Sequence, residues 1–211
     1  MKIHYLESVD STQTYLKYLL QSNKITTPYA VVTNKQTNGI GSRDNKWKGM
    51  DGNLFLSFAM DIDDLPSDLK LESASIYFAY ILKSTLEELG SNIWLKWPND
   101  FYINEKKIGG MITNLFGNAL VCGVGLNLVR FPENFDILDI TINKEKLLNL
   151  YFKNIEKKPL WKQVFSKYKL EFYRNQEFFT HNDNLRISLG EAELQSDGSI
   201  MVNKMRIYSL R

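Results

Sequence analysis

The feature that most constrains this chain is a pair of apolar segments joined by a two-residue turn signal. Residues 107–116 (KIGGMITNLF) and 119–128 (ALVCGVGLNL) flank Gly117-Asn118. Such a pair between two strand-like runs is typical of a tight β-hairpin. Both runs carry glycines inside apolar sequence, which weakens a strand and often marks a place where a ligand or another backbone comes close. The pattern therefore predicts a buried hairpin with a backbone surface that faces a ligand.

Strand and helix patterns alternate along the rest of the chain. We expect strands at 1–9, 29–34, 54–60, 93–97 and 101–103, with a turn at Asn104–Lys107. We expect one helix to follow Ser11 or Thr12, a second to cover 68–89, and further helical structure within 144–177. Ser11 or Thr12 provides an N-cap and Gly90 a helix stop. Pro159 suits a first helical position. A stripe at helical spacing indicates core: Trp161, Val164, Phe165, Tyr168 and Phe172.

The tail of the chain has a different character. Residues 185–211 suggest short strands around turns at Gly190 and Asp197-Gly198. We therefore predict an α/β (α+β) chain with a larger unit over 1–180 and a small β unit over 181–211. A chain of 211 residues fits one medium domain with such an appendage.

Composition excludes several classes of protein. The net charge is +2, from 26 basic and 24 acidic residues, whereas a nucleic-acid-binding chain is normally far more basic. Cys122 is the single cysteine, so no intrachain disulfide forms. No signal peptide and no run of 18 apolar residues is present. We expect a soluble cytoplasmic protein without a nucleic-acid or membrane partner.

One segment is locally basic. Residues 144–174 hold nine Lys or Arg and three Glu. A solvated helix face explains this composition, and a docking surface for an acidic partner is the alternative.

Common catalytic patterns are missing, and three other features stand out. His4 and His181 lie far apart in the sequence and suggest neither a metal cluster nor a Ser-His-Asp triad. No Walker A pattern occurs. The three features are the loop Gly39-Ile40-Gly41-Ser42-Arg43, the run Lys96-Trp97-Pro98-Asn99-Asp100 followed by Lys107-Ile108-Gly109-Gly110, and Gly123-Val124-Gly125-Leu126-Asn127.

Each feature has a functional and an ordinary interpretation. The glycine loop can bring backbone N–H groups and Arg43 to a phosphate, or it can be a simple connection. Lys107, beside two glycines, can meet a phosphate or carboxylate, or it can belong to a polar turn. Asn127 would be a polar group entering apolar surroundings, where it needs a partner.

Taken together, the motifs resemble the biotin–protein ligase family. The ordered set is Asp10-Ser11-Thr12-Gln13, Gln36-Thr37-x-Gly39-x-Gly41, Trp47, Lys96-Trp97-Pro98-Asn99-Asp100, Lys107-Ile108-Gly109-Gly110 and Gly123-x-Gly125-x-Asn127. It spans roughly residues 1–130, and the tail looks like the family's C-terminal SH3-like domain. The resemblance implies a catalytic domain with a mixed sheet and helices, like that of class II aminoacyl-tRNA synthetases.

The resemblance also implies roles for individual residues. The biotin-binding positions would be Ser11, Thr12, Gln13, Gln36, Gly39, Ile40, Gly41, Ser42, Lys107, Gly110 and Gly125. The positions for ATP or the adenylate would be Arg43, Trp47, Lys96, Asn99, Lys107, Asn127 and Arg211. Lys107, Asp100 and Arg43 would act in catalysis. No residue is assigned to a protein-bound metal.

One motif departs from the family pattern. The family loop usually has the form glycine-arginine-glycine-arginine-x-glycine, whereas Ile40 and Ser42 stand at the two arginine positions here. Arg43 is the nearest cation. We therefore expect Arg43 to turn inward and hold the adenylate, with a solvent-facing Arg43 paired to Asp44 as the alternative.

The implied activity is ATP-dependent biotinylation. Biotin would react with ATP and Mg²⁺ to give biotinyl-5′-AMP, and biotin would then pass to a lysine of the biotin carboxyl carrier protein of acetyl-CoA carboxylase. A lipoate or octanoate ligase and a catalytically weak biotin-binding regulator are the alternatives. Ser11 lies so near the start that we expect no helix-turn-helix and no operator binding. A monomer or homodimer is expected.

Overall fold

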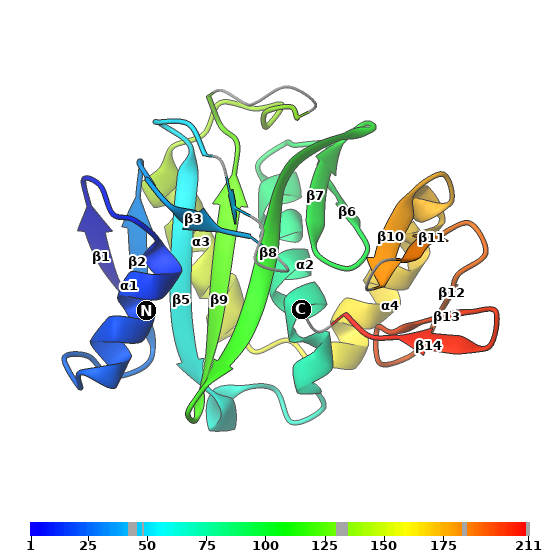
Figure 1. The fold of residues 1–211 in the computed structure, drawn as a ribbon, viewed down its shortest axis with the longest axis horizontal. Coiled ribbons are helices and arrows are strands. Elements are labelled where there is room, and N and C mark those ends of the chain that lie inside the picture. The colour runs from blue at the N-terminus through cyan, green and yellow to red at the C-terminus, as the bar shows by residue number, and fades with distance from the viewer. Residues whose placement is uncertain (42–45, 48, 130–134, 183–184, 210–211) are drawn as a thin grey trace.

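The fold is a mixed sheet covered by helices on both faces, with small β-hairpins at one end (Figure 1). The computed structural model describes residues 1–41, 46–47, 49–129, 135–182 and 185–209. Within these ranges seven strands form the central sheet, in the order β1-β2-β5-β9-β8-β7-β6. The pair β1–β2 is parallel and the other neighbours are antiparallel. The strand bounds are β1 Lys2–Leu6, β2 Tyr29–Thr33, β5 Leu54–Asp61, β6 Trp94–Lys96, β7 Asp100–Ile103, β8 Lys106–Phe116 and β9 Ala119–Leu126.

The predicted hairpin forms the middle of this sheet. β8 and β9 pair antiparallel over their length, and Gly117 occupies the left-handed region with φ +58° in the turn between them. Glycine adopts this conformation without a steric penalty, which explains why the turn occurs there. The turn before β8 is also confirmed, although it is shorter than predicted, because Lys106 and Lys107 already belong to the strand.

Alternating residues of the central strands face two different hydrophobic layers. On β2, Tyr29 and Val31 pack with α1 (Thr12–Gln21), whereas Ala30 and Val32 join the larger core on the opposite face. That core lies beneath α2 (Ala74–Glu88) and α3 (Lys144–Glu156), seen behind the sheet in Figure 1. The strands β2, β5 and β9 are therefore buried on both sides, which accounts for their nearly continuous apolar sequences.

The helices begin and end close to their predicted bounds, and the cap predicted at Ser11 or Thr12 is confirmed. Ser11, rather than Thr12, is the N-cap of α1, and its Oγ accepts from the Thr14 N–H at 3.4 Å. The helix predicted over 68–89 begins as a 3-10 turn, η3 (Leu71–Ser73), so 68–70 are not helical. A second 3-10 turn, η2 (Ile62–Asp64), follows β5.

The prediction for Pro159 was wrong. The helix α4 spans Trp161–Glu171, its N-cap is Leu160, and Pro159 precedes the cap. The stripe is confirmed: Trp161, Val164 and Tyr168 are buried, and Phe165 and Phe172 pack against the core. The 3-10 turn η4 (Phe172–Asn175) then leads to the last strands.

The C-terminal strands form small antiparallel sheets that share the main core. The hairpin β10 (Phe179–Asn182) and β11 (Leu185–Ser188) precedes the sheet of β12 (Glu193–Leu194), β13 (Ile200–Val202) and β14 (Met205–Ile207). The buried residues Ile187, Leu189, Ile200, Val202 and Ile207 belong to the same cluster as α2 and the central sheet. The boundary predicted between 180 and 181 falls inside β10, so the division into two units remains a prediction.

Hydrogen bonds reinforce this attachment. The indole N–H groups of Trp97 and Trp161 donate to the carbonyls of Gly198 and Ser196, each at 2.8 Å. The Ser73 hydroxyl, at the N-terminus of α2, donates to the Asp197 carbonyl at 2.5 Å. The C-terminal strands are therefore fixed against the first residues of α2 and α4.

No helix within the described residues is long and apolar enough to cross a membrane.

Candidate active site

A narrow cavity lies over the middle of the sheet, between α1 and the strands β5, β8 and β9. Twelve residues to which the family resemblance had given a site role line it: Ser11, Thr12, Gln13, Gln36, Ile40, Gly41, Trp47, Asn99, Asp100, Lys107, Gly110 and Gly125. Positions that are up to 114 residues apart in the sequence thus meet in one site. The short strands β3 (Gly39–Ile40) and β4 (Lys46–Trp47) form its cover.

One end of the cavity is polar and tightly hydrogen-bonded. The side-chain carbonyl of Gln36 accepts from the Thr12 N–H at 2.8 Å and from its hydroxyl at 3.0 Å. The Thr12 hydroxyl also lies 2.8 Å from the Ser57 hydroxyl. These groups come from α1, the loop after β2, and β5. Their hydrogen bonds fix donors and acceptors in place, which suits recognition of a small polar head group.

Gln13 is held differently. Its side-chain amide donates to the side-chain oxygen Oδ1 of Asn114 at 2.8 Å, which links α1 to β8. Ser11 faces the cavity and also caps α1, so its substitution would affect both the wall and the helix.

The other end of the cavity carries a cluster of charges. The Lys107 Nζ lies 2.6 Å from Oδ1 of Asp100, and the Lys96 Nζ lies 3.6 Å from Oδ2 of the same carboxylate. Two cations thus share one acid. Lys107 and Asp100 are about one quarter exposed, whereas Lys96 is nearly buried. The arrangement leaves excess positive charge, suited to an incoming carboxylate or phosphate.

Two glycines allow close approach in the cavity. A Cβ at Gly110 would lie 3.2 Å from the Asp100 carboxylate, and one at Gly125 would lie 2.5 Å from the Trp47 ring. The indole therefore rests on the Gly125 backbone. Its buried N–H has no hydrogen-bond partner among the described residues. The cavity holds only about 40 Å³ in this arrangement, well below the several hundred Å³ usual for a ligand pocket.

Several predicted site residues lie elsewhere. Gly39 packs beneath Trp47 and Gln36 without lining the cavity, and Lys96 faces an adjoining hollow. The Asn127 amide accepts from Asn53 at 3.1 Å and donates to the Asp136 carbonyl at 3.2 Å, so it connects loops at the strand end. Its contact with ATP remains a prediction. Ser42, Arg43 and Arg211 lie outside the described residues.

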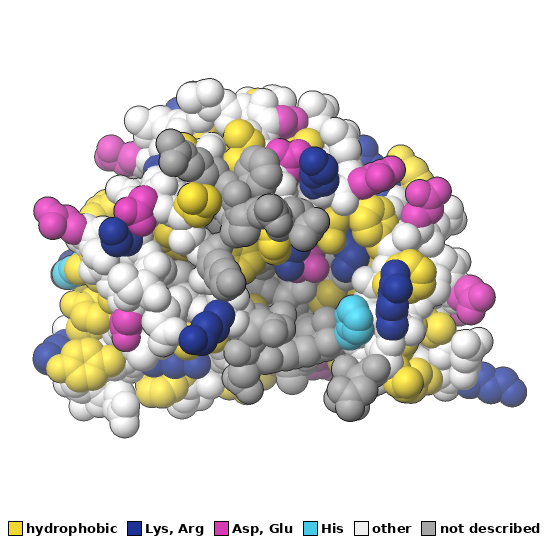
Figure 2. Space-filling view, turned by 45° about the horizontal axis from the view of Figure 1, so that its top comes forward, with side chains coloured by type: hydrophobic (Ala, Val, Ile, Leu, Met, Phe, Trp, Pro, Cys, Tyr) yellow, Lys and Arg dark blue, Asp and Glu magenta, His cyan; other side chains and the backbone are white. Residues whose placement is uncertain are grey.

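The adjoining hollow begins at Lys107 and Asp100, which line both spaces. It encloses about 660 Å³. Figure 2 shows this face hollowed at its centre, with basic and acidic side chains gathered there. The other residues that line the hollow are Lys96, Tyr102, Glu177, Phe178, Phe179, His181 and Arg186.

The sequence had not indicated part of this site. Ser57 carried a weak signal, since it is the one polar residue in the run LFLSFAM. Leu56, Met111 and Ile112 also line the cavity and carried no signal. His181 and Arg186 carried no signal, because only the packing of β10 and β11 brings them to the hollow.

Comparison with known proteins gives the family to which this fold and site belong. Residues 5–127 match the profile of the Biotin/lipoate A/B protein ligase family. The chain belongs to this family. It is 28% identical over 141 residues to the bifunctional ligase/repressor BirA of Salmonella typhimurium, a match covering 64% of the chain and 43% of that protein. The Escherichia coli BirA is 29% identical over 130 residues, with 58% and 39% covered. The chain thus spans about two fifths of these curated relatives.

Solved structures match over nearly the whole chain. A biotin acetyl coenzyme A carboxylase synthetase from Helicobacter pylori, crystallised with bound biotinylated ATP, is 39% identical with a TM-score of 0.94, covering 98% of this chain and 99% of that one. The biotin protein ligase from Aquifex aeolicus, in complex with biotin and ATP, is 23% identical with a TM-score of 0.79, covering 100% and 96%. The second likeness concerns the fold alone. The predicted fold, like that of class II synthetases, is confirmed.

Proposed function

We propose that this protein is a biotin–protein ligase, which joins biotin to a lysine of a carrier protein at the expense of ATP. The observation that carries the proposal is the near-complete match to the Helicobacter pylori synthetase with biotinylated ATP bound. The cavity supports it, because nine of the eleven residues that the family motif assigns to biotin line one continuous space.

The cavity suits biotin at both ends. Thr12, Gln36 and Ser57 offer fixed polar groups for the ureido ring. Leu56, Met111, Ile112 and Val124 provide apolar walls for the remaining ring and chain. The carboxylate would then reach Lys107, where an ammonium group neutralises it and orients it.

The first chemical step would take place at Lys107. The biotin carboxylate attacks the α-phosphorus of ATP, and pyrophosphate leaves. Lys107 stabilises the charge that develops on the phosphoryl oxygens, and Asp100 holds Lys107 in position. The fixed ion pair means that little reorganisation is needed during the reaction. Trp47 and the strands β3 and β4 would keep water from the mixed anhydride.

Mg²⁺ is expected to enter with ATP. Within the described residues no group of three or more His, Cys, Asp or Glu side chains could hold a metal ion. Mg²⁺ seldom needs a full set of protein ligands, because it usually keeps several waters and binds substrate phosphates. Bound there, the ion would neutralise phosphate charge.

The second step would transfer biotin to a lysine of the biotin carboxyl carrier protein of acetyl-CoA carboxylase. We place the protein in the cytoplasm, where this carrier would be met, and leave monomer and homodimer as the two expected states.

Biotin-dependent exchange of pyrophosphate into ATP tests the proposal. The protein is expected to exchange labelled pyrophosphate into ATP only when biotin is present, with lipoate and octanoate as controls. Exchange supported by lipoate and not by biotin would assign the other branch of the family, and no exchange with any acid would leave only a binding role.

A further inference from the structure

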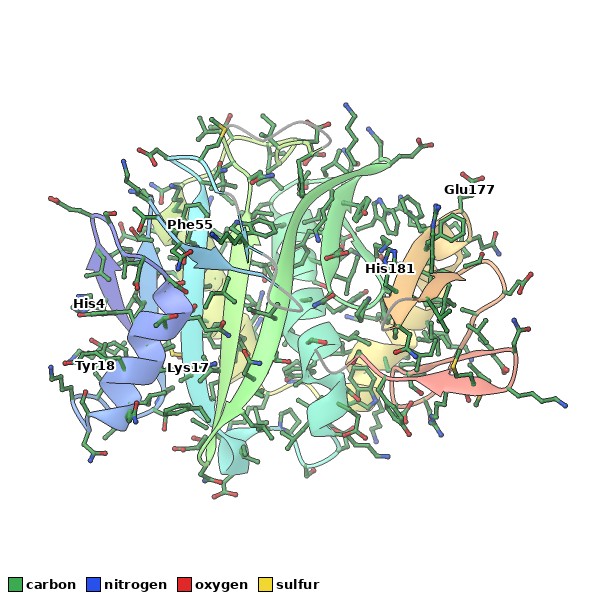
Figure 3. The ribbon with its side chains drawn as sticks, viewed as in Figure 1. His4, Lys17, Tyr18, Phe55, Glu177 and His181 are labelled. Atoms are coloured by element: carbon green, nitrogen blue, oxygen red, sulfur yellow. The ribbon has the colours of Figure 1, made fainter. Side chains whose placement is uncertain are left out.

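The open hollow beside the narrow cavity provides a route to the reaction centre. Lys107 and Asp100 line both spaces, so a group that enters through the hollow arrives where the carboxylate of the cavity's ligand would lie. Figure 3 labels His181 on β10, on the side that faces the end of the central sheet formed by β7 and β6. His181 is exposed, on the side from which an acceptor would come.

We propose that His181 accepts the proton of the acceptor lysine in the transfer step. The inference rests on the proposed function, since only a ligase carries out this step. A lysine side chain is an ammonium ion near neutral pH and has no lone pair for attack. A nearby base that removes the proton raises the rate of such a step, typically by a factor of about 10² to 10⁴.

The charged and titratable groups that line the hollow with His181 come from five other segments. They are Lys96 of β6, Asp100 and Tyr102 of β7, Lys107 of β8, Glu177 before β10, and Arg186 of β11. Any of these groups that could accept a proton would compete with the His181 imidazole for the proton of the acceptor lysine.

The acids and the phenol are poorer candidates than the imidazole. Both carboxylate oxygens of Asp100 lie next to ammonium groups, at 2.6 and 3.6 Å. Burial raises the pKa of Tyr102, and Asp100 adds to this effect, so the phenol keeps its proton. A carboxylate such as that of Glu177 is intrinsically a weaker base than an imidazole.

The cations cannot accept a proton. The guanidinium of Arg186 stays charged and stacks on Phe179 at 3.8 Å. Lys96 and Lys107 are committed to Asp100 as ammonium partners. Among the described residues that line the hollow, the imidazole is therefore the group best matched to the task.

In the transfer step the acceptor nitrogen loses two protons, and a C–N bond replaces a C–O bond. The ammonium gives one proton to the His181 ring nitrogen and becomes an amine. Its nitrogen lone pair attacks the biotinyl carbonyl carbon, a C–N bond forms, and the C–O bond to phosphate breaks. AMP leaves with that electron pair and takes the second proton from nitrogen. The imidazolium then returns its proton to water.

The test separates the two half-reactions in His181→Gln and His181→Asn. Biotin-dependent pyrophosphate exchange is expected to stay within twofold of the wild type, whereas transfer from preformed biotinyl-AMP to the carrier lysine slows at least tenfold near pH 7. Hydroxylamine, an amine that is unprotonated at neutral pH, is expected to react with the adenylate at the wild-type rate in both variants. His4→Gln is the matched control, because His4 lies on β1 at the opposite end of the sheet.

The pH dependence of transfer gives a second readout. The transfer rate of the wild type is expected to rise less steeply with pH than the rates of the variants, in which the acceptor lysine has to lose its proton unaided. The difference in transfer rate between the wild type and the variants therefore narrows at alkaline pH. The role of His181 would be overturned by a ratio of wild-type to variant transfer rates that stays constant with pH. It would also be overturned if the variants lost equal activity in both half-reactions, or if their transfer rate equalled that of the wild type. Absence of exchange in the wild type would instead contradict the proposed function.

Discussion

The ammonium of Lys107 lies 2.6 Å from the carboxylate of Asp100, across the pair of strands β7 and β8. The two residues come from separate motifs of the sequence. Their ion pair stands at the junction of a narrow cavity and an open hollow, so it marks the point where two substrates would meet.

Lys107→Ala is expected to slow biotin-dependent pyrophosphate exchange at least tenfold, or about 1.4 kcal/mol of transition-state stabilisation. The reason is the loss of the cation at the reacting carboxylate. Lys106→Ala is the matched control, since Lys106 is the exposed neighbour on the same strand. Exchange by a folded Lys107→Ala protein at the rate of the control would exclude this role.

Trp47 is expected to move when biotin binds. Its indole rests on Gly125, and the remaining cavity of about 40 Å³ is too small for a ligand of this size. Trp94, Trp97 and Trp161 are buried in the core. Titration with biotin should therefore change tryptophan fluorescence in the wild type and leave it nearly unchanged in Trp47→Phe. The same signal in both proteins would show that the indole stays in place.

The central part of the fold could be predicted from the sequence because its signals are local. Gly117-Asn118 sets the β8–β9 turn, and Gly90 follows the end of α2. The error at Pro159 has a physical cause: Leu160 provides the cap and Gln163 bonds back to its N–H at 3.0 Å, which starts the helix later.

The meeting of the charged residues could also be predicted, whereas the hollow could not. Lys96, Asp100 and Lys107 lie within twelve positions of one another on adjacent strands, so their meeting follows from local pairing. His181 and Arg186 reach the hollow only because the C-terminal hairpin packs beside β7, a long-range contact that leaves no local pattern.

Removal of the C-terminal strands is expected to unfold the protein. A chain that ends before β10 loses Ile187, Leu189, Ile200, Val202 and Ile207 from the main core. It also leaves the buried indole N–H of Trp97 without its acceptor, a loss of about 1–3 kcal/mol. Circular dichroism of residues 1–178 should show no cooperative thermal transition. A stable, cooperatively melting fragment would indicate an independent catalytic domain.

Asp197 is expected to make stability depend on pH. Burial alone would raise the pKa of its carboxyl, but the hydrogen bonds from Ser199 and the Arg206 guanidinium outweigh burial and hold the pKa below its usual value. A carboxyl with a lowered pKa in the folded state stabilises the fold above its unfolded pKa, and this contribution is lost as the pH falls through the folded pKa.

The consequence can be measured with Asp197→Asn. Its free energy of unfolding should fall below that of the wild type at pH 7, and the difference should shrink below about pH 4. Asp64→Asn, which removes an exposed pair with Lys158, should have a much smaller effect at all pH values. A pH-independent difference for Asp197→Asn would show that the charge of the carboxylate is unimportant.

The most direct test of the whole account is the covalent product. The purified protein, incubated with ATP, Mg²⁺, biotin and a biotin carboxyl carrier protein, is expected to add one biotinyl group to a single carrier lysine, as located by mass spectrometry of the digested carrier. Omission of ATP or substitution of that lysine by arginine should abolish the addition. A carrier that stays unmodified with biotin, or that is modified with lipoate in its place, would contradict the account.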